Sequence, residues 1–217
     1  MSMREAYTEQ LDEISDAIIE MVEHVEKAVG LSTEALLTAD AQVAESVISE
    51  DDELDRLRVQ IEEQSFELMA LQQPVATDLR MLVSSLRIVA DLERMGDLAV
   101  HVAKIARMRV PALAIPDELR PMFERAGEVT QSMVRMAGEV IRDRDLEKVD
   151  QVIASDEEID LIRRRGFEIM LGPSWKYGIE PAIDLALLGR YYERIADHAV
   201  SVVRRVVFLV TGEGHPA

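Results

Sequence analysis

The sequence Glu93-Arg94-Met95-Gly96-Asp97 returns 100 residues later as Glu193-Arg194-Ile195-Ala196-Asp197. A second acidic stretch also occurs twice, as DDELD at residues 51–55 and as DEEID at residues 156–160. Each copy therefore contains two pairs of acids at positions i and i+4, which lie on one face of a helix. Like charges at this spacing repel each other, and the chain repeats that cost four times. The pattern indicates an internal repeat of helical units and a cation that offsets the repulsion.

The composition favours a helical globular protein. With 217 residues, the chain is long enough for one large or two small domains. A hydrophobic content of 48% with 30% charged residues is usual for soluble proteins, and only 4% aromatic content beside abundant Ala, Leu and Glu favours helices. The chain has no cysteine, which excludes disulfides and zinc sites built from thiolates.

The net charge of −18 restricts the possible partners. Nucleic-acid backbones and anionic lipids should repel such a chain, so we expect neither nucleic-acid binding nor direct insertion into a membrane. Residues 1–13 lack the apolar run of a signal peptide, and no stretch approaches the ~20 apolar residues of a transmembrane helix. We therefore expect a cytoplasmic protein.

Helical periodicity and the positions of proline and glycine predict an all-α fold of six long, antiparallel helices. The predicted helices span residues 4–37, 40–71, 74–110, 118–142, 145–171 and 181–211. Asp40 and Asp145 are the expected N-caps of the second and fifth helices, and Pro74 is expected in the first turn of the third. Short turns between long helices predict two tandem, repeated three-helix bundles, residues 1–110 and 111–217, joined by a linker near residues 110–117.

Residue counting places the acidic pairs opposite each other. Asp51 and Asp55 precede the turn at residues 72–74 by about as many residues as Glu93 and Asp97 follow it. In an antiparallel hairpin, equal distances from the turn put residues at equal height, so the two pairs should face each other. The turn at residues 175–178 relates the second copy in the same way. The predicted metal ligands are Asp51, Asp55, Glu93 and Asp97 in one half, and Asp156, Asp160, Glu193 and Asp197 in the other.

An all-carboxylate site suits hard cations such as Mg, Mn, Fe(III) or Ca, with Zn also possible. None of the four histidines follows a glutamate by three residues, so the Glu-x-x-His site of ferritin-like proteins is not expected. His101 and His198 have no histidine at the equivalent repeat position, and we interpret them as packing or surface residues. Two alternatives to a metal site are a solvated acidic face and structural salt bridges to Arg94 and Arg194, or to Arg87 and Arg190.

The chain shows no phosphate-cradling glycine loop, nucleophile elbow or Ser/His/Asp spacing, which predicts a protein without catalytic activity. One rival interpretation is a metal-dependent hydrolase whose paired, carboxylate-bound metals activate water. Another is a purely structural adaptor whose acids are only surface charge.

Three stretches resemble the PhoU family: QQPVATDLR at residues 72–80, ADLERMGD at 90–97 and GRYYERIADHA at 189–199. The stretch RRVVFLVTG at 204–212 is similar to actinobacterial members. The resemblance covers nearly the whole chain and implies two repeated three-helix bundles. Glu/Asp-x-x-x-Asp motifs bind multinuclear metal clusters in some members, and they correspond to the eight acids named above. Ala196 stands where the family often has glycine, and the added methyl group is expected to narrow slightly the groove beside the second set of acids.

The resemblance also implies a function. A PhoU-like protein is expected to be a negative regulator of phosphate uptake and phosphate-starvation signalling. It would act as an adaptor between the ATPase subunit of a phosphate ABC transporter and a sensor histidine kinase, reaching the membrane only through these partners. We expect a homodimer that carries metal cations and performs no catalysis.

Overall fold

Six α-helices make up nearly all of the chain, of which the computed structural model describes residues 3–213. The helices are α1 (Met3–Thr38), α2 (Ala41–Gln72), α3 (Ala76–Arg109), α4 (Arg120–Asp143), α5 (Glu147–Leu171) and α6 (Ile179–Thr211). A short 3₁₀ helix, η1 (Asp117–Leu119), precedes α4. The all-α prediction of two repeated three-helix bundles is confirmed. Within the described residues, no helix combines the length and apolar character needed to cross a membrane.

The helix ends follow the predicted capping residues with two differences. Asp40 caps α2 as predicted, since its carboxylate accepts hydrogen bonds from the backbone N–H groups of Gln42 and Val43 at 2.8 and 3.0 Å. Asp145 accepts only from the N–H of Glu147, at 3.0 Å, and Leu146 is the N-cap of α5. Pro74 lies before α3 rather than in its first turn, because Val75 is extended and α3 begins at Ala76.

The core forms along one stripe of each helix. On α1 one apolar stripe is buried in full: Leu11, Ile14, Ile18, Met21, Val22, Val25 and Val29. These residues recur at intervals of three and four, which places them on one side of a helix. On α3, Leu82, Val89 and Val100 are buried at intervals of seven and eleven residues, which also fall on one side of a helix. Burial of these stripes removes enough apolar surface from water to hold the helices together.

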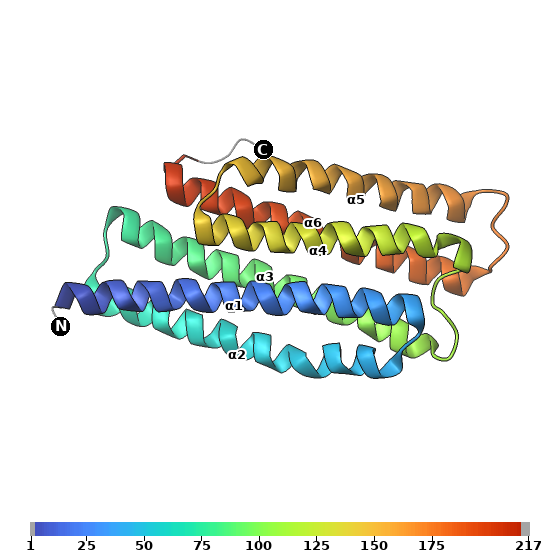
Figure 1. Ribbon diagram of the computed structural model, residues 1–217, viewed down its shortest axis with the longest axis horizontal. Coiled ribbons are helices and arrows are strands. Elements are labelled where there is room, and N and C mark those ends of the chain that lie inside the picture. Colours follow the sequence, from blue (N-terminus) through green and yellow to red (C-terminus); the bar gives the residue numbers. More distant parts are fainter. Residues whose placement is uncertain (1–2, 214–217) are drawn as a thin grey trace.

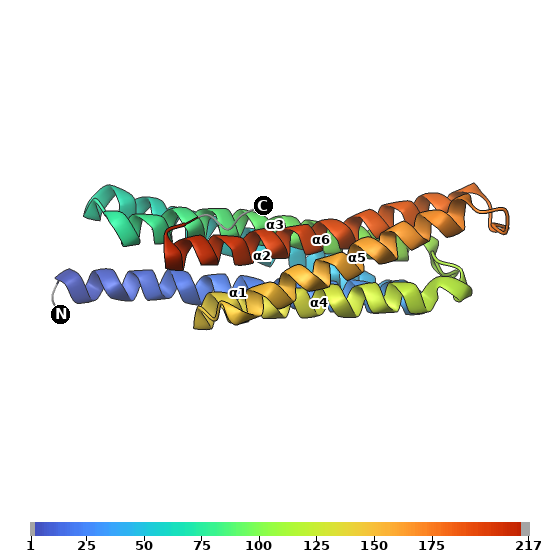
Figure 2. The ribbon, with the colours of Figure 1, turned by 90° about the horizontal axis from the view of Figure 1, so that it is seen from above.

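The two three-helix bundles lie side by side and run in opposite directions. The turn between α2 and α3 is at one end of the elongated molecule, and the turn between α5 and α6 is at the other (Figures 1 and 2). Helices α1 and α3 contact α4 and α6 across the boundary, whereas α2 and α5 contact only helices of their own bundle among the described residues. The chain crosses between bundles over residues 110–116. The predicted domain boundary at residue 110 stays a prediction.

Close contact between α1 and α4 depends on glycine. A Cβ atom at Gly127 would overlap the side chain of Thr33, and a Cβ at Gly138 would lie 2.7 Å from Cγ1 of Val22. The two contacts are equivalent under the internal repeat, because position 127 corresponds to 22 and position 138 to 33. The bundles are therefore related by an approximate two-fold axis that passes between these helices.

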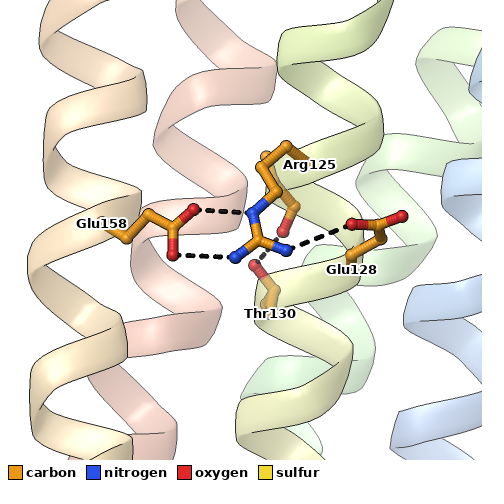
Figure 3. A network of polar contacts seen from close by, with 5 residues as sticks. Arg125, Glu128, Thr130 and Glu158 are labelled. Atoms are coloured by element: carbon orange, nitrogen blue, oxygen red, sulfur yellow. Dashed lines mark hydrogen bonds and ion pairs between the residues drawn. The ribbon is translucent and has the colours of Figure 1, made fainter.

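One acid of the repeated stretch serves the packing of the second bundle. Glu158 of α5 receives two hydrogen bonds from Arg125 of α4, from Nε at 2.7 Å and from Nη2 at 3.1 Å (Figure 3). Arg125 also donates to Glu128 at 3.3 Å within its own helix. The guanidinium group of Arg125 thus links α4 to α5. Asp156 and Asp160 lie on the other side of α5, close to the acids of α6.

Candidate functional site

The first acidic site lies along the seam between α2 and α3. Burial raises the pKa of Asp51, and the negative charges of Asp97 and Asp55 raise it further. Burial likewise raises the pKa of Glu93, with Asp97 and Asp55 again adding to the effect. All four acids therefore lie close enough for their charges to act on one another, as the counting from the turn predicted.

The second acidic site repeats this arrangement between α5 and α6. Burial, followed by the charges of Asp197, Asp160 and Glu193, raises the pKa of Asp156 from 3.8 to about 6. The pKa of Asp197 is also raised, first by burial and then by Glu193. A carboxylate with a raised pKa is a group whose negative charge the fold disfavours, and a bound cation would relieve that.

Arginine side chains distinguish the two sites. In the second site, Glu193 is only 8% exposed and forms ion pairs with Arg190, one turn earlier on α6, and with Arg163 of α5 at 3.5 Å. In the first site, Arg58 lies 3.7 Å from Asp55, and no ion pair of Glu93 occurs among residues 3–213. The salt-bridge alternative therefore describes Glu193 and not Glu93.

The repeat predicts this difference when it is read position by position. Arg58 of α2 and Arg163 of α5 are equivalent at an offset of 105 residues, so each site has one arginine on the helix that carries its two aspartates. Arg190, however, corresponds to Ala90. The first site thus lacks the arginine of its own helix that pairs with the glutamate, and only the more distant charges of Arg58 and Arg94 act on Glu93.

Gly96 shapes the first site. A Cβ atom at this position would overlap Cδ2 of Leu54 and lie 3.9 Å from Oδ1 of Asp51. A cavity of about 20 Å³ lies beside it, lined also by His24 of α1, a residue for which the sequence suggested no role. Ala196 occupies the equivalent position in the second site. The glycine lets Leu54 pack against the backbone of α3 next to the carboxylates.

The donor chemistry of both sites fits a hard cation, because every predicted ligand is a carboxylate. In the part of the chain that the structure describes, no three His, Asp or Glu side chains converge into a ready-made metal site. A cation held here would therefore be bound by one or two carboxylates at a time, with water completing its coordination. Mg²⁺ is commonly held in this way, since it retains several of its waters.

A buried polar cluster that the sequence did not predict lies between α3 and α6. Asp91, 8% exposed, accepts hydrogen bonds from Ser201 at 3.1 Å and from Nε of Arg205 at 2.9 Å, and its Oδ1 lies 2.9 Å from Nδ1 of His198. Burial by itself would raise the pKa of Asp91, but the hydrogen bonds with His198 and Arg205 outweigh burial and lower it. His198 is thus a partner of a buried carboxylate and not simply a packing or surface residue.

The signal for this cluster was the spacing on α6. Residues 198, 201 and 205 recur at intervals of three and four, which puts His, Ser and Arg on one face. At the equivalent place in the other half, His101 packs edge-on against Tyr191 with their ring centroids 5.3 Å apart. The repeat therefore carries a charged cluster on one side of its axis and an aromatic pair on the other.

Known proteins share the two-part organisation of this chain. The family model described as the PhoU domain matches the chain twice, over residues 18–106 and 123–206. The phosphate-specific transport system accessory protein PhoU homolog 2 of Mycobacterium tuberculosis is 46% identical over 210 residues, covering 97% of this chain and 99% of the relative. PhoU homolog 1 of Mycobacterium leprae is 44% identical, covering 97% of this chain and 95% of the relative.

Solved structures agree with the fold. The crystal structure of PhoU from Pseudomonas aeruginosa superimposes with a TM-score of 0.85 at 27% identity, covering 95% of this chain and all of that chain (100%). The phosphate transport system regulatory protein PhoU from Streptococcus pneumoniae gives a TM-score of 0.87 at 24% identity, covering 97% and 100% of the two chains. The second comparison, at its lower identity, supports the fold alone.

Proposed function

The chain belongs to the PhoU family, and on that premise we propose that it is an accessory protein of phosphate-specific transport that restrains phosphate uptake and phosphate-starvation signalling. It acts as an adaptor, without catalysis of its own, between the ATPase subunit of a phosphate ABC transporter and a sensor histidine kinase. The similarity to named accessory proteins over nearly the full length of both chains is the observation that carries this proposal.

Exposed apolar side chains at both hairpin tips support an adaptor role. Leu71 and Val75 are 69% and 74% exposed at the turn between α2 and α3, and Leu171 and Ile179 are 83% and 79% exposed around the turn between α5 and α6. Large apolar groups that remain in water next to one another commonly mark protein contacts. The two tips lie at opposite ends of the molecule (Figure 1), so one copy can contact two partners, or one partner and a second copy in a homodimer.

The acidic sites give the adaptor two places for a cation. We propose one hard cation in each half, between α2 and α3 and between α5 and α6, with Mg, Mn, Fe, Zn and Ca as candidates. The raised pKa values of Asp51, Glu93, Asp156 and Asp197 support this proposal, because burial and then the neighbouring acids disfavour the charged form of each carboxyl. The first site is the more available one, since its Glu93 lacks the arginine that neutralises Glu193.

Deletion of the gene tests the regulatory role. Cells that lack the protein should keep phosphate-starvation genes switched on in phosphate-rich medium, and the tagged protein should co-purify with the transporter's ATPase subunit or with a histidine kinase. Unchanged expression in a strain without any second family member would contradict the role. Hydrolysis of phosphate esters by the purified protein, lost in Glu93→Gln, would instead support the metal-dependent hydrolase.

Metal titration tests the cation sites separately. We expect the Glu93→Gln/Asp97→Asn variant to lose about half of the Mn²⁺ or Mg²⁺ bound by the unaltered protein, as measured by equilibrium dialysis with elemental analysis. The matched control is Asp12→Asn/Asp16→Asn, an exposed pair on α1 with the same spacing and the same change of charge. Equal binding by all three proteins would show that the acids of the seam hold no specific cation.

A further inference from the structure

A basic pocket opens between α3 and α6, beside the second acidic site. Its volume is about 480 Å³, and Asp156 and Asp197 are the acids that line it. Its other polar lining residues are three arginines and two serines: Arg87, Arg204, Arg205, Ser84 and Ser201. Clustering of three guanidinium groups is unexpected in a chain with a net charge of −18. We define these five residues as the arginine pocket.

Several N–H donors of the guanidinium groups in the arginine pocket have no acceptor among the described residues. Nε of Arg204 is buried and lacks a hydrogen-bond partner, and neither Arg87 nor Arg204 has an ion pair within the described chain. Arg205 is held by its Nε, which donates to Asp91 at 2.9 Å, while its two terminal nitrogens make no hydrogen bond to any described residue. Asp91 thus fixes the orientation of Arg205 and leaves its outer N–H groups available.

The internal repeat provides a natural comparison for this pocket. At an offset of 100 residues, Arg87 corresponds to Leu187, Arg204 to Lys104 and Arg205 to Ile105. Ser84 corresponds to Asp184, whose carboxylate is already bound by Arg109 at 2.7 Å. The fold by itself therefore does not require arginines here, and the cluster is a property of one side of the molecule.

We propose that the arginine pocket binds a phosphate group. Planar guanidinium groups with free N–H donors match the oxygens of a phosphate, and hydroxyl groups such as those of Ser84 and Ser201 supply further donors. The proposal goes beyond the adaptor function and needs no cation in the acidic sites. Two of the proposed cation ligands, Asp156 and Asp197, also line the arginine pocket, so its test is made with a chelator present and does not depend on the metal proposal.

The two acids that line the pocket give it selectivity. Asp156 and Asp197 are these acids, and an ionised carboxylate accepts hydrogen bonds but donates none. A phosphate that retains a proton has an O–H to donate to these acids, whereas sulfate at neutral pH has none and is repelled by them. The same acids, with Asp91, weaken the attraction of the three arginines for any anion, so we expect an affinity in the millimolar range.

Titration with inorganic phosphate tests the proposal on the full chain. Binding is measured by equilibrium dialysis with radiolabelled phosphate at constant ionic strength and with a chelator present. Arg204→Met and Arg87→Leu should each weaken binding about tenfold, because each removes charge-assisted hydrogen bonds. The matched control is Lys104→Met, which alters the equivalent position of Arg204 and the net charge by the same amount, and it should leave binding unchanged. Thermal unfolding of each variant verifies that it folds.

Competing ligands complete the test. Sulfate should bind at least about tenfold more weakly than phosphate, and sulfate that binds equally well would contradict the role of Asp156 and Asp197. The affinity for ATP is compared with the affinity for inorganic phosphate. Tighter binding of ATP would identify a nucleotide as the source of the phosphate group, and tighter binding of inorganic phosphate would identify free phosphate. No saturable binding of either, or equal weakening by Lys104→Met and Arg204→Met, would overturn the proposal.

Discussion

The two acidic sites have the same four carboxylates but different neighbours. In the second site, Arg190 and Arg163 neutralise the nearly buried Glu193, whereas Ala90 stands where an arginine would neutralise Glu93. The α3–α6 boundary differs in a similar way, with the Asp91 cluster on one side of the pseudo-two-fold axis and the pair of His101 and Tyr191 on the other. A duplicated pattern can therefore keep its acids while the residues one turn away decide what those acids do.

The largest difference between the two sides should come from the Asp91 cluster. Asp91→Ala leaves Arg205 and His198 without their partner at a largely buried position, and we expect a loss of about 2–3 kcal/mol in the free energy of unfolding. Urea denaturation measures this loss. Tyr191→Phe on the opposite side is the control, since it retains the ring and should change stability by less than about 0.5 kcal/mol. Similar losses for both variants would show that the boundary is symmetric in energy.

The pH dependence of Asp156 gives the next largest effect. The pKa of this carboxyl is raised to about 6 in the folded protein, so the folded state holds its proton more tightly than the unfolded chain does. Stability from this group is present in full below about pH 4 and is lost as the pH rises through about 6. Asp156→Asn should therefore stabilise the protein by about 1–2 kcal/mol at pH 7.5, a value reduced for partial exposure.

Thermal unfolding across this pH range is the measurement for Asp156→Asn. Most of the gain should disappear at pH 4, where the natural carboxyl is protonated in the folded state and about half protonated in the unfolded chain. A gain of undiminished size at pH 4 would assign the effect to packing rather than to charge. Added Mn²⁺ should reduce the difference at pH 7.5, because a cation bound only to the folded state stabilises the unaltered protein by mass action.

The two glutamates should respond to the same substitution with opposite signs. Glu193→Gln removes the partner of Arg190 and Arg163 and should destabilise the protein by about 1 kcal/mol. Glu93→Gln removes a carboxylate whose pKa is raised by burial and by Asp97, and it should stabilise by a few tenths of a kcal/mol at neutral pH. Chemical denaturation in a chelating buffer measures both. Stability changes of the same sign in Glu193→Gln and Glu93→Gln would show that the two glutamates have equivalent surroundings.

The smallest effect is expected on cation affinity, when the arginine at position 190 is removed from the second site or an arginine is introduced at position 90 in the first. Arg190→Ala should raise the affinity of the second site for Mn²⁺ a few-fold, because the guanidinium competes with the cation for Glu193. Ala90→Arg should lower the affinity of the first site by a similar factor. Calorimetric titration of the two variants measures both changes, and an unchanged affinity in both would separate cation binding from these glutamates.

The fold was predictable because the helix signals are local. Periodic apolar residues, the Asp40 cap and the Gly172 and Gly212 ends appear within a few residues of the elements they define, and the duplicated motifs indicated two bundles. The predicted starts of α3 at Pro74 and of α5 after Asp145 differ from the observed starts by one or two residues. Helix termini are uncertain by this amount because similar sequences can begin a helix one residue earlier or later.

Antiparallel geometry made the facing of the acids predictable too. Distance from a turn converts directly into height along a hairpin, so Asp51 and Asp97 could be placed together from their numbers in the sequence. Identification of the arginine that neutralises Glu193 needed only the i+3 relation to Arg190, but the reach of Arg163 from the neighbouring helix depended on packing.

By itself, the sequence determined the six helices, the repeat, and the carboxylate pairs on both seams, because each depends on periodicity or on spacing along one hairpin. Only the tertiary structure decided which faces of α3 and α6 meet between the bundles. That contact joins residues more than 100 positions apart, such as Asp91 and Arg205, whose separation is 114 residues. The burial of Asp91 and the grouping of Arg87 with Arg204 follow from this packing, since helix rotation at a distant interface is set by the sum of many side-chain contacts and not by any local pattern.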